Sequence, residues 1–102
     1  MTTARADIVT LASAVDESGD TTPLIAAYGA GNTVAGVAGD AELLAAAATD
    51  RKVLVQAIGG AIYLSFSTPA NAEPRGVVAA GSALMVKLAA GQSLRVAAAA
   101  LS

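Results

Sequence analysis

The hydrophobic residues of this chain fall into short segments in which every second position is apolar. The clearest segment lies past the middle of the chain, where Ile62, Leu64 and Phe66 alternate with the other side chains. A period of two is typical of a β-strand with one buried face. We therefore predict that these three side chains point into the core, whereas Tyr63 and Ser65 face outward or contact a neighbouring molecule.

Glycine, proline and polar residues separate these segments and mark the turns. Residues 7–15 alternate in the same way and end at an acidic turn, residues 16–20. Gly59-Gly60 separates two strand-like segments, and glycines in that position predict a β-hairpin because glycine adopts positive φ without steric cost. The pattern predicts further strands at 24–28, 76–79, 84–88 and 93–97, and further loops or turns at 29–32, 68–74 and 89–92.

Residues 40–48 are compatible with two structures. Asp40 could cap a helix, and the alanines behind it are strong helix formers. The alternative is a strand over 42–46 that runs into a turn. Taken alone, the residues of this segment leave both alternatives open.

Short strands at regular spacing predict an all-β fold. We expect a small antiparallel β-sandwich, with at most one short helix, formed by one domain over residues 1–102. The polar residues at about 1–7 predict a short N-terminal arm ahead of the first strand. Ala12-Ser13-Ala14 has the form of a signal-peptide cleavage site, but Asp7 and Thr10 interrupt the preceding segment and favour a strand there.

The amino-acid composition points to a thin core. Hydrophobic residues make up 55% of the chain, but 27 of the 102 residues are alanine and only 24 are Val, Leu or Ile. The longest unbroken apolar runs have six residues, whereas a membrane-spanning helix needs about 20, so we expect no membrane association. A core this thin indicates that apolar surface is shared with neighbouring subunits, and we expect a homo-oligomer.

The polar residues do not predict a chemical site. The chain lacks Cys and His, which excludes thiol and imidazole catalysis and the usual zinc sites. Its net charge of −2 gives no electrostatic case for binding nucleic acid. Gly29 and Gly31 lack the third glycine of a dinucleotide loop, since position 34 is Val34, and the acidic residues of 16–20 are too few for a calcium loop. We predict no catalytic, cofactor-binding or metal-binding residues, and a protein that is not an enzyme.

Four short motifs follow one another within residues 42–97. They are a polar turn with Arg-Lys at 51–52, a Leu-Val-Gln strand at 54–56, an Ile-Tyr-Leu-Ser-Phe strand at 62–66 behind a glycine turn, and Leu-Ala-Ala-Gly-Gln-Ser-Leu at 88–94, which suggests a hairpin. In this order they resemble small β-sandwich virion proteins of tailed bacteriophages, such as head fibres, head decorations and head-spike bases. The sequence departs from that pattern at 57–58. The resemblance favours the strand over the helix at 42–46.

The resemblance implies a structural role in a phage or a phage-like particle such as a gene transfer agent. The expected place is the capsid surface of the virion, after assembly in the bacterial cytoplasm, and the expected partners are further copies and the major capsid protein or another virion protein. A low share of charged residues, 14%, fits a surface that is largely covered by protein. Two alternatives remain: a tail or connector component, and a secreted carbohydrate-binding β-sandwich whose tyrosines, Tyr28 and Tyr63, would contact sugar.

Overall fold

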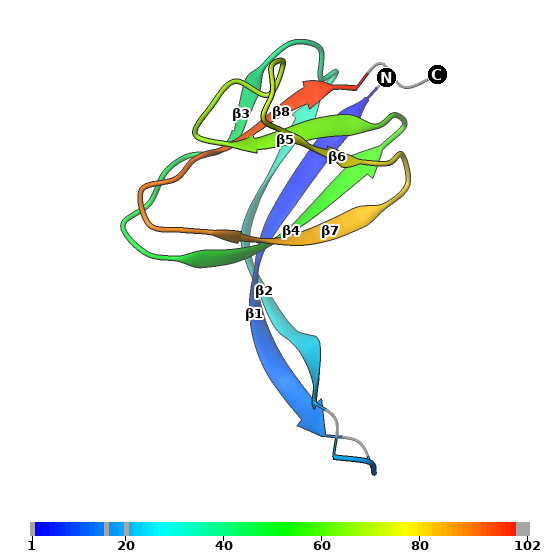
Figure 1. Cartoon of the computed structure of the whole chain (residues 1–102), viewed down its shortest axis with the longest axis vertical. Helices are drawn as coiled ribbons and strands as arrows, with labels where there is room; N and C mark the ends of the chain where they lie inside the picture. Colours follow the sequence, from blue (N-terminus) through cyan, green and yellow to red (C-terminus); the bar gives the residue numbers. More distant parts are fainter. Residues whose placement is uncertain (1, 16, 20, 100–102) are drawn as a thin grey trace.

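A computed structural model describes residues 2–15, 17–19 and 21–99 of the chain, and within them the regular structure consists of strands alone (Figure 1). The strands are β1 (Thr3–Val15), β2 (Thr21–Ala35), β3 (Ala41–Leu44), β4 (Arg51–Ile58), β5 (Ile62–Phe66), β6 (Gly76–Val78), β7 (Ala83–Leu88) and β8 (Leu94–Ala98). Within the same residues, no helix is long and apolar enough to cross a membrane.

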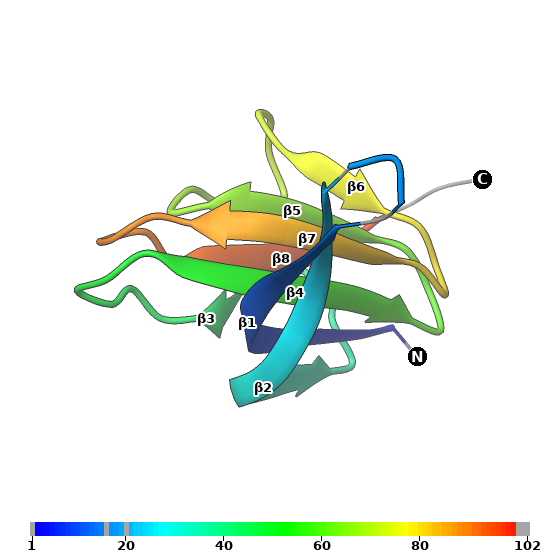
Figure 2. The same cartoon turned by 90° about the horizontal axis from the view of Figure 1, so that it is seen from below.

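The eight strands form two four-stranded antiparallel sheets. The first sheet has the order β2-β1-β4-β7 and the second the order β3-β8-β5-β6. Figure 2 gives a second view of the two sheets, in which their strands overlap. The predicted all-β sandwich is therefore confirmed.

The core between the sheets is built from small and medium aliphatic side chains. In β4 every second residue is buried, which gives Val53, Val55 and Ala57, and in β8 Leu94 and Val96 are fully buried opposite them. Ala4 and Ala6 of β1 are fully buried too, and their small side chains let the strand lie close to the core. Because alternate side chains of each strand point inward, they pack together into one contiguous core.

The glycine pair at 59–60 connects the two sheets and does not form a hairpin. β4 pairs with β1 and β7, whereas β5 pairs with β6 and β8. Gly59 has φ +77°, which turns the chain from one layer into the other. The hairpin prediction was wrong because strands that face each other across a core show the same alternation as strands paired within a sheet. The turn at 89–92 also links the two sheets, from β7 to β8.

Residues 29–32, predicted as a loop, lie inside β2. Gly29 and Gly31 occupy places where β2 passes closely over β1, since a Cβ atom on Gly31 would lie 2.9 Å from the Ala6 carbonyl oxygen. The register between the strands also shifts between Asp7 and Val9, where β2 carries one extra residue, which is a β-bulge. These glycines allow β2 to pass close to β1. The local sequence pattern predicts a loop at this position because glycine and asparagine are frequent in loops.

Three further predictions are settled by the strands. Residues 3–7, assigned to an N-terminal arm, form the centre of the first sheet between β2 and β4, because their alternate alanines fit the core. Residues 41–44 form β3, so this segment is a strand.

Ile62 and Leu64 of β5 are buried as predicted, but Phe66 at the end of this strand is 37% exposed. Ser65 is buried, and its hydroxyl donates a hydrogen bond to the Thr68 carbonyl of the loop that follows.

Candidate interaction surface

The most prominent feature outside the core is a two-stranded arm made by the far halves of β1 and β2. β1 pairs with β4 only as far as Val9, opposite Lys52, and beyond that point β1 pairs with β2 alone. Figure 1 shows this ribbon projecting from the two sheets along the longest axis of the molecule, which measures 45 Å against 33 and 23 Å for the other axes. Six residues of β1, 10–15, extend past the sheet, which corresponds to about 20 Å.

The arm changes the dimensions of the whole molecule. The radius of gyration is 14.3 Å, whereas a compact domain of this length is expected near 13 Å. The arm therefore lies outside the compact body.

Several of these side chains are large and apolar. Leu24, Ile25 and Tyr28 of β2 are 49%, 37% and 64% exposed. Ile25 lies opposite Leu11 in the register, and Tyr28 lies opposite Val9, so these two pairs extend along the ribbon. Exposed apolar side chains grouped on one element are typical of a surface that contacts protein.

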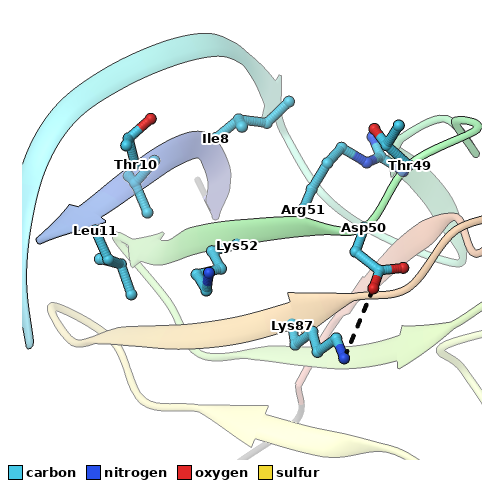
Figure 3. A pocket seen from close by; sticks show the side chains of 9 residues that line it. Ile8, Thr10, Leu11, Thr49, Asp50, Arg51, Lys52 and Lys87 are labelled. Carbon is cyan, nitrogen blue, oxygen red and sulfur yellow. Dashed lines mark ion pairs between the residues drawn. The ribbon is translucent and has the colours of Figure 1, made fainter.

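An open groove of about 630 Å³ lies at the root of the arm (Figure 3). Leu11 and Thr10 of the arm form one wall, and the start of β4 with the end of β7 forms the other. Lys52 and Lys87 are directly opposite each other on neighbouring strands, so both side chains project to the same face of the first sheet. The groove therefore combines an apolar wall with a row of cations.

The charge balance of this groove favours an anionic partner. Two like charges opposite each other on neighbouring strands repel. Asp50 offsets this only weakly, since its Oδ2 is 3.8 Å from Lys87 Nζ and both side chains are more than half exposed. Among the described residues, Lys52 makes no ion pair.

A bidentate ion pair fixes the first sheet beside the arm. The Arg5 guanidinium donates hydrogen bonds from Nε and Nη2 to the two oxygens of Asp7, at 3.0 and 2.8 Å, and from Nη1 to Thr33 Oγ1 at 2.8 Å. The Asp7 carboxylate lies over Gly31, its partner in the register. This arrangement ties β2 to β1 within the first sheet.

The ion pair between Asp40 and Arg95 holds the second sheet. Arg95 donates to both oxygens of Asp40, with Nη2 2.5 Å from Oδ2, and the Ala70 amide donates to Asp40 Oδ1. The hydrogen bonds from Arg95 and then that from Ala70 lower the pKa of Asp40 below its ordinary value of 3.8. This pair fastens the 68–74 loop to β8 and has a structural role.

The other residues considered for chemistry lie apart from one another. Glu17 and Gly19 are exposed at the tip of the arm, while positions 16 and 20 lie outside the described residues. Within the described part of the chain, no group of three or more acidic, Cys or His residues could hold a metal ion. Arg75 lies over the ring of Tyr63, 3.6 Å from its centroid, and so covers one face of that ring, whereas Tyr28 lies opposite Val9, at the root of the arm. The carbohydrate-binding alternative stays a prediction.

Sequence reasoning assigned an arm to the wrong residues. Local patterns could not locate the arm, because they predicted strands at 7–15 and 24–28 and a loop at 29–32, whereas the observed strands span 3–15 and 21–35 and are far longer than the others. Globular strands usually have about 5–6 residues, so strands of 13 and 15 residues extend beyond a small sandwich.

Comparisons with known proteins found no relative of this chain. No family model, curated protein or solved structure matches this chain.

Proposed function

We propose that this chain is a non-enzymatic structural subunit of a tailed-phage or phage-like particle, such as a gene transfer agent, and that it attaches through its β1–β2 arm. The observation that carries the proposal is the arm itself, which leaves Leu24, Ile25 and Tyr28 exposed. An exposed apolar ribbon is costly for a free protein and becomes favourable when a protein surface covers it.

The particle is supported by the resemblance of residues 42–97 to small head-fibre, decoration and spike-base proteins. Those residues form β3 to β8, the part of the sandwich that carries no arm. The body would then provide a stable, alanine-rich unit on the capsid surface, and the arm would join it to further copies and to the major capsid protein. A place in the tail or connector is the competing location.

The test is incorporation into particles made by the bacterium that encodes the chain. Particles are purified by density-gradient sedimentation, heads are separated from tails, and the chain is quantified by mass spectrometry in each fraction. We expect the wild-type chain in the head fraction at a fixed copy number. A chain found in the tail fraction would correct the location, and a chain absent from all particles would refute the proposal.

Two variants test the role of the arm in the same experiment. Leu24→Ser with Tyr28→Ser removes apolar surface from the arm without touching the core. Val77→Ser is the matched control, because Val77 is 47% exposed on β6, at the edge of the second sheet. Normal incorporation of the arm variant, or equal loss in both, would contradict attachment through the arm.

A further inference from the structure

We infer that two copies of this chain join through the free edge of β7, so that their first sheets form one continuous antiparallel sheet. This inference goes beyond the proposed function, because β7 lies at the opposite edge of that sheet from β2 and its arm. The contact therefore leaves the arm free to attach to a particle.

The outer edge of β7 presents backbone groups that no strand of the chain pairs with. The Ala57 amide donates a hydrogen bond to the Ser82 carbonyl at 3.1 Å, at the start of the ladder between β4 and β7. Bonded positions alternate along an antiparallel pair, so the amides and carbonyls of Ala83, Met85 and Lys87 point away from β4. Among the described strands, β7 has a neighbour on one side only, which leaves these groups available to a second chain.

β7 is also the most regular of the four edge strands. Its six residues pair with β4 without a shift in register, and they include no proline and a single charged side chain, that of Lys87. The pairing of β2 and that of β3 are interrupted by register shifts, and β6 has only three residues. Short or irregular edges resist the addition of a strand, whereas a regular apolar edge favours it.

Two large apolar side chains are exposed on β7, one on each face of the first sheet. Leu84 lies opposite the buried Val55, so it points to the core side, and it is 43% exposed. Met85 lies opposite Leu54 on the outer face and is 39% exposed. A second strand beside β7 would cover both side chains, and the burial of this apolar surface would stabilise the contact.

The sequence of β7 is complementary to itself in one antiparallel register. In this register Met85 faces Met85 of the second copy across a two-fold axis, and the strands exchange about six hydrogen bonds. Leu84 then lies opposite Val86 of the second copy, which covers it with an apolar side chain. Ala83 lies opposite Lys87 of the second copy, so the two lysines stay apart. Registers nearer the C-terminus shorten the ladder and bring the two Lys87 side chains together, where they repel. This self-complementarity identifies the added strand as the β7 of another copy.

Cysteine crosslinking tests the contact at its axis. The chain has no cysteine of its own, so Met85→Cys gives each copy one thiol. Opposite residues of a hydrogen-bonded pair have Cα atoms about 5.5 Å apart, a distance that a disulfide bridges. We expect Met85→Cys to form a disulfide-linked dimer under mild oxidation about tenfold faster than Val77→Cys. Val77 is the matched control, because it is 47% exposed on β6.

A mixture of Ala83→Cys and Lys87→Cys tests the register. These two positions face each other across the axis, whereas two copies of either variant alone keep their thiols about 13 Å apart along the strands. We expect the mixture to give a crosslinked heterodimer and each variant alone to give little. With one variant labelled with ¹⁵N, mass spectrometry distinguishes the heterodimer from either homodimer.

Removal of one backbone donor tests the hydrogen bonds of the edge. Met85→Pro removes an outward amide and leaves the ladder between β4 and β7 in place, since proline is tolerated where the N–H of an edge strand faces solvent. Met85→Val keeps the amide and is the matched control. Sedimentation velocity over a concentration series should show a dissociation constant that rises about tenfold or more for Met85→Pro and changes little for Met85→Val. Circular dichroism melts check that both variants fold.

Hydrogen exchange measured by NMR tests the same edge without any substitution. The amides of Ala83, Met85 and Lys87 should exchange more slowly in a concentrated sample of the wild-type chain than in a dilute one. The amides of Asn71 and Glu73, in the exposed part of the 68–74 loop, should exchange at the same rate in both samples.

Three results would each overturn the inference: a wild-type chain that is monomeric at about 100 μM, β7 amides that exchange equally fast in both samples, or Met85→Cys that crosslinks no faster than Val77→Cys. Incorporation into particles is measured separately. A monomer that still enters particles would refute the β7 contact and leave the proposed function standing. A dimer joined through β7 that enters no particle would support the contact and refute the proposed function.

Discussion

Replacement of Gly31 by alanine tests the close contact that holds β2 against β1 within the first sheet. A Cβ atom at this position would lie under 3.0 Å from Asp7 Oδ1 and 3.3 Å from Asp7 Cγ, whereas ordinary contacts begin at 3.4 Å. The Asp7 side chain must therefore move, although it is held by two hydrogen bonds from Arg5 and is only 11% exposed. The backbone carbonyl of Ala6, at 2.9 Å, blocks relaxation on the other side.

The expected loss of stability follows from these contacts. Overpacking of this kind costs about 1–3 kcal/mol, and weakened charged hydrogen bonds add to that cost, although exposure of Arg5 reduces their share. We expect Gly31→Ala to lower the free energy of unfolding by about 2 kcal/mol, which corresponds to about 10 °C in Tm for a domain of this size. Urea denaturation and a thermal melt followed by circular dichroism measure both quantities.

Two further variants show whether the loss of stability comes from the contact between Gly31 and Asp7. Gly39→Ala is the matched control, since nothing lies within 4 Å of a Cβ there, and its effect should stay within about 0.5 kcal/mol. In an Asp7→Ala background the cost of Gly31→Ala should fall by about 1 kcal/mol, because the side chain it displaces is gone. A Gly31→Ala variant as stable as Gly39→Ala, or one that costs the same stability with and without Asp7, would contradict the close contact between Gly31 and Asp7.

Two further predictions concern the second sheet. Ile62→Ala should lower the free energy of unfolding by about 2–5 kcal/mol because Ile62 is fully buried, whereas Phe66→Ala should lower it by less, since Phe66 is 37% exposed; equal losses in denaturation experiments would contradict the burial difference. The lowered pKa of Asp40 contributes stability that is present above pH 3.8, its ordinary value, and is lost as the pH falls through the lower pKa of the folded state. Asp40→Asn should therefore be less stable than wild type at pH 7, and the difference should shrink below about pH 4; a difference in Tm that stays constant from pH 7 to pH 2 would count against the Arg95 pairing.

The alternation of side chains was enough to predict the strands but could not predict which strands pair. Val53 and Val55 of β4 and Ile62 and Leu64 of β5 each form one buried stripe. The same stripes would occur if the two strands were neighbours in one sheet. The pairing is decided by contacts far along the chain, because β4 lies between β1 and β7.

The glycines of β2 illustrate a second limit. A Gly-Ala-Gly-Asn sequence is a loop signal when only near neighbours are considered. Gly31 is needed because Asp7, 24 positions earlier, occupies the space of its side chain. This requirement comes from a contact between residues far apart in the sequence, so the pattern of neighbouring residues cannot predict it.

The candidate surface was predictable only in part. The sequence contains the acidic turn and the two lysines, Lys52 and Lys87, as separate features. Neither feature by itself predicts an interaction site. Their relation depends on where β4 begins, since pairing of β1 with β4 stops at Val9 and Lys52 and leaves the rest of β1 to form the arm. The lengths of β1 and β2 define the arm, but its side chains are exposed because no further strand pairs with β1 beyond Val9.

Photo-crosslinking from the root of the arm within assembled particles shows directly whether the chain docks through this surface. A photoreactive phenylalanine analogue replaces Tyr28, which is 64% exposed on β2, and the same analogue replaces Val77 on β6 as the control. We expect position 28 to crosslink to a second copy or to another virion protein in high yield, and position 77 to do so far less. Particles in which position 28 gives no protein crosslink, or no more than position 77, would contradict the claim that the arm is the docking element.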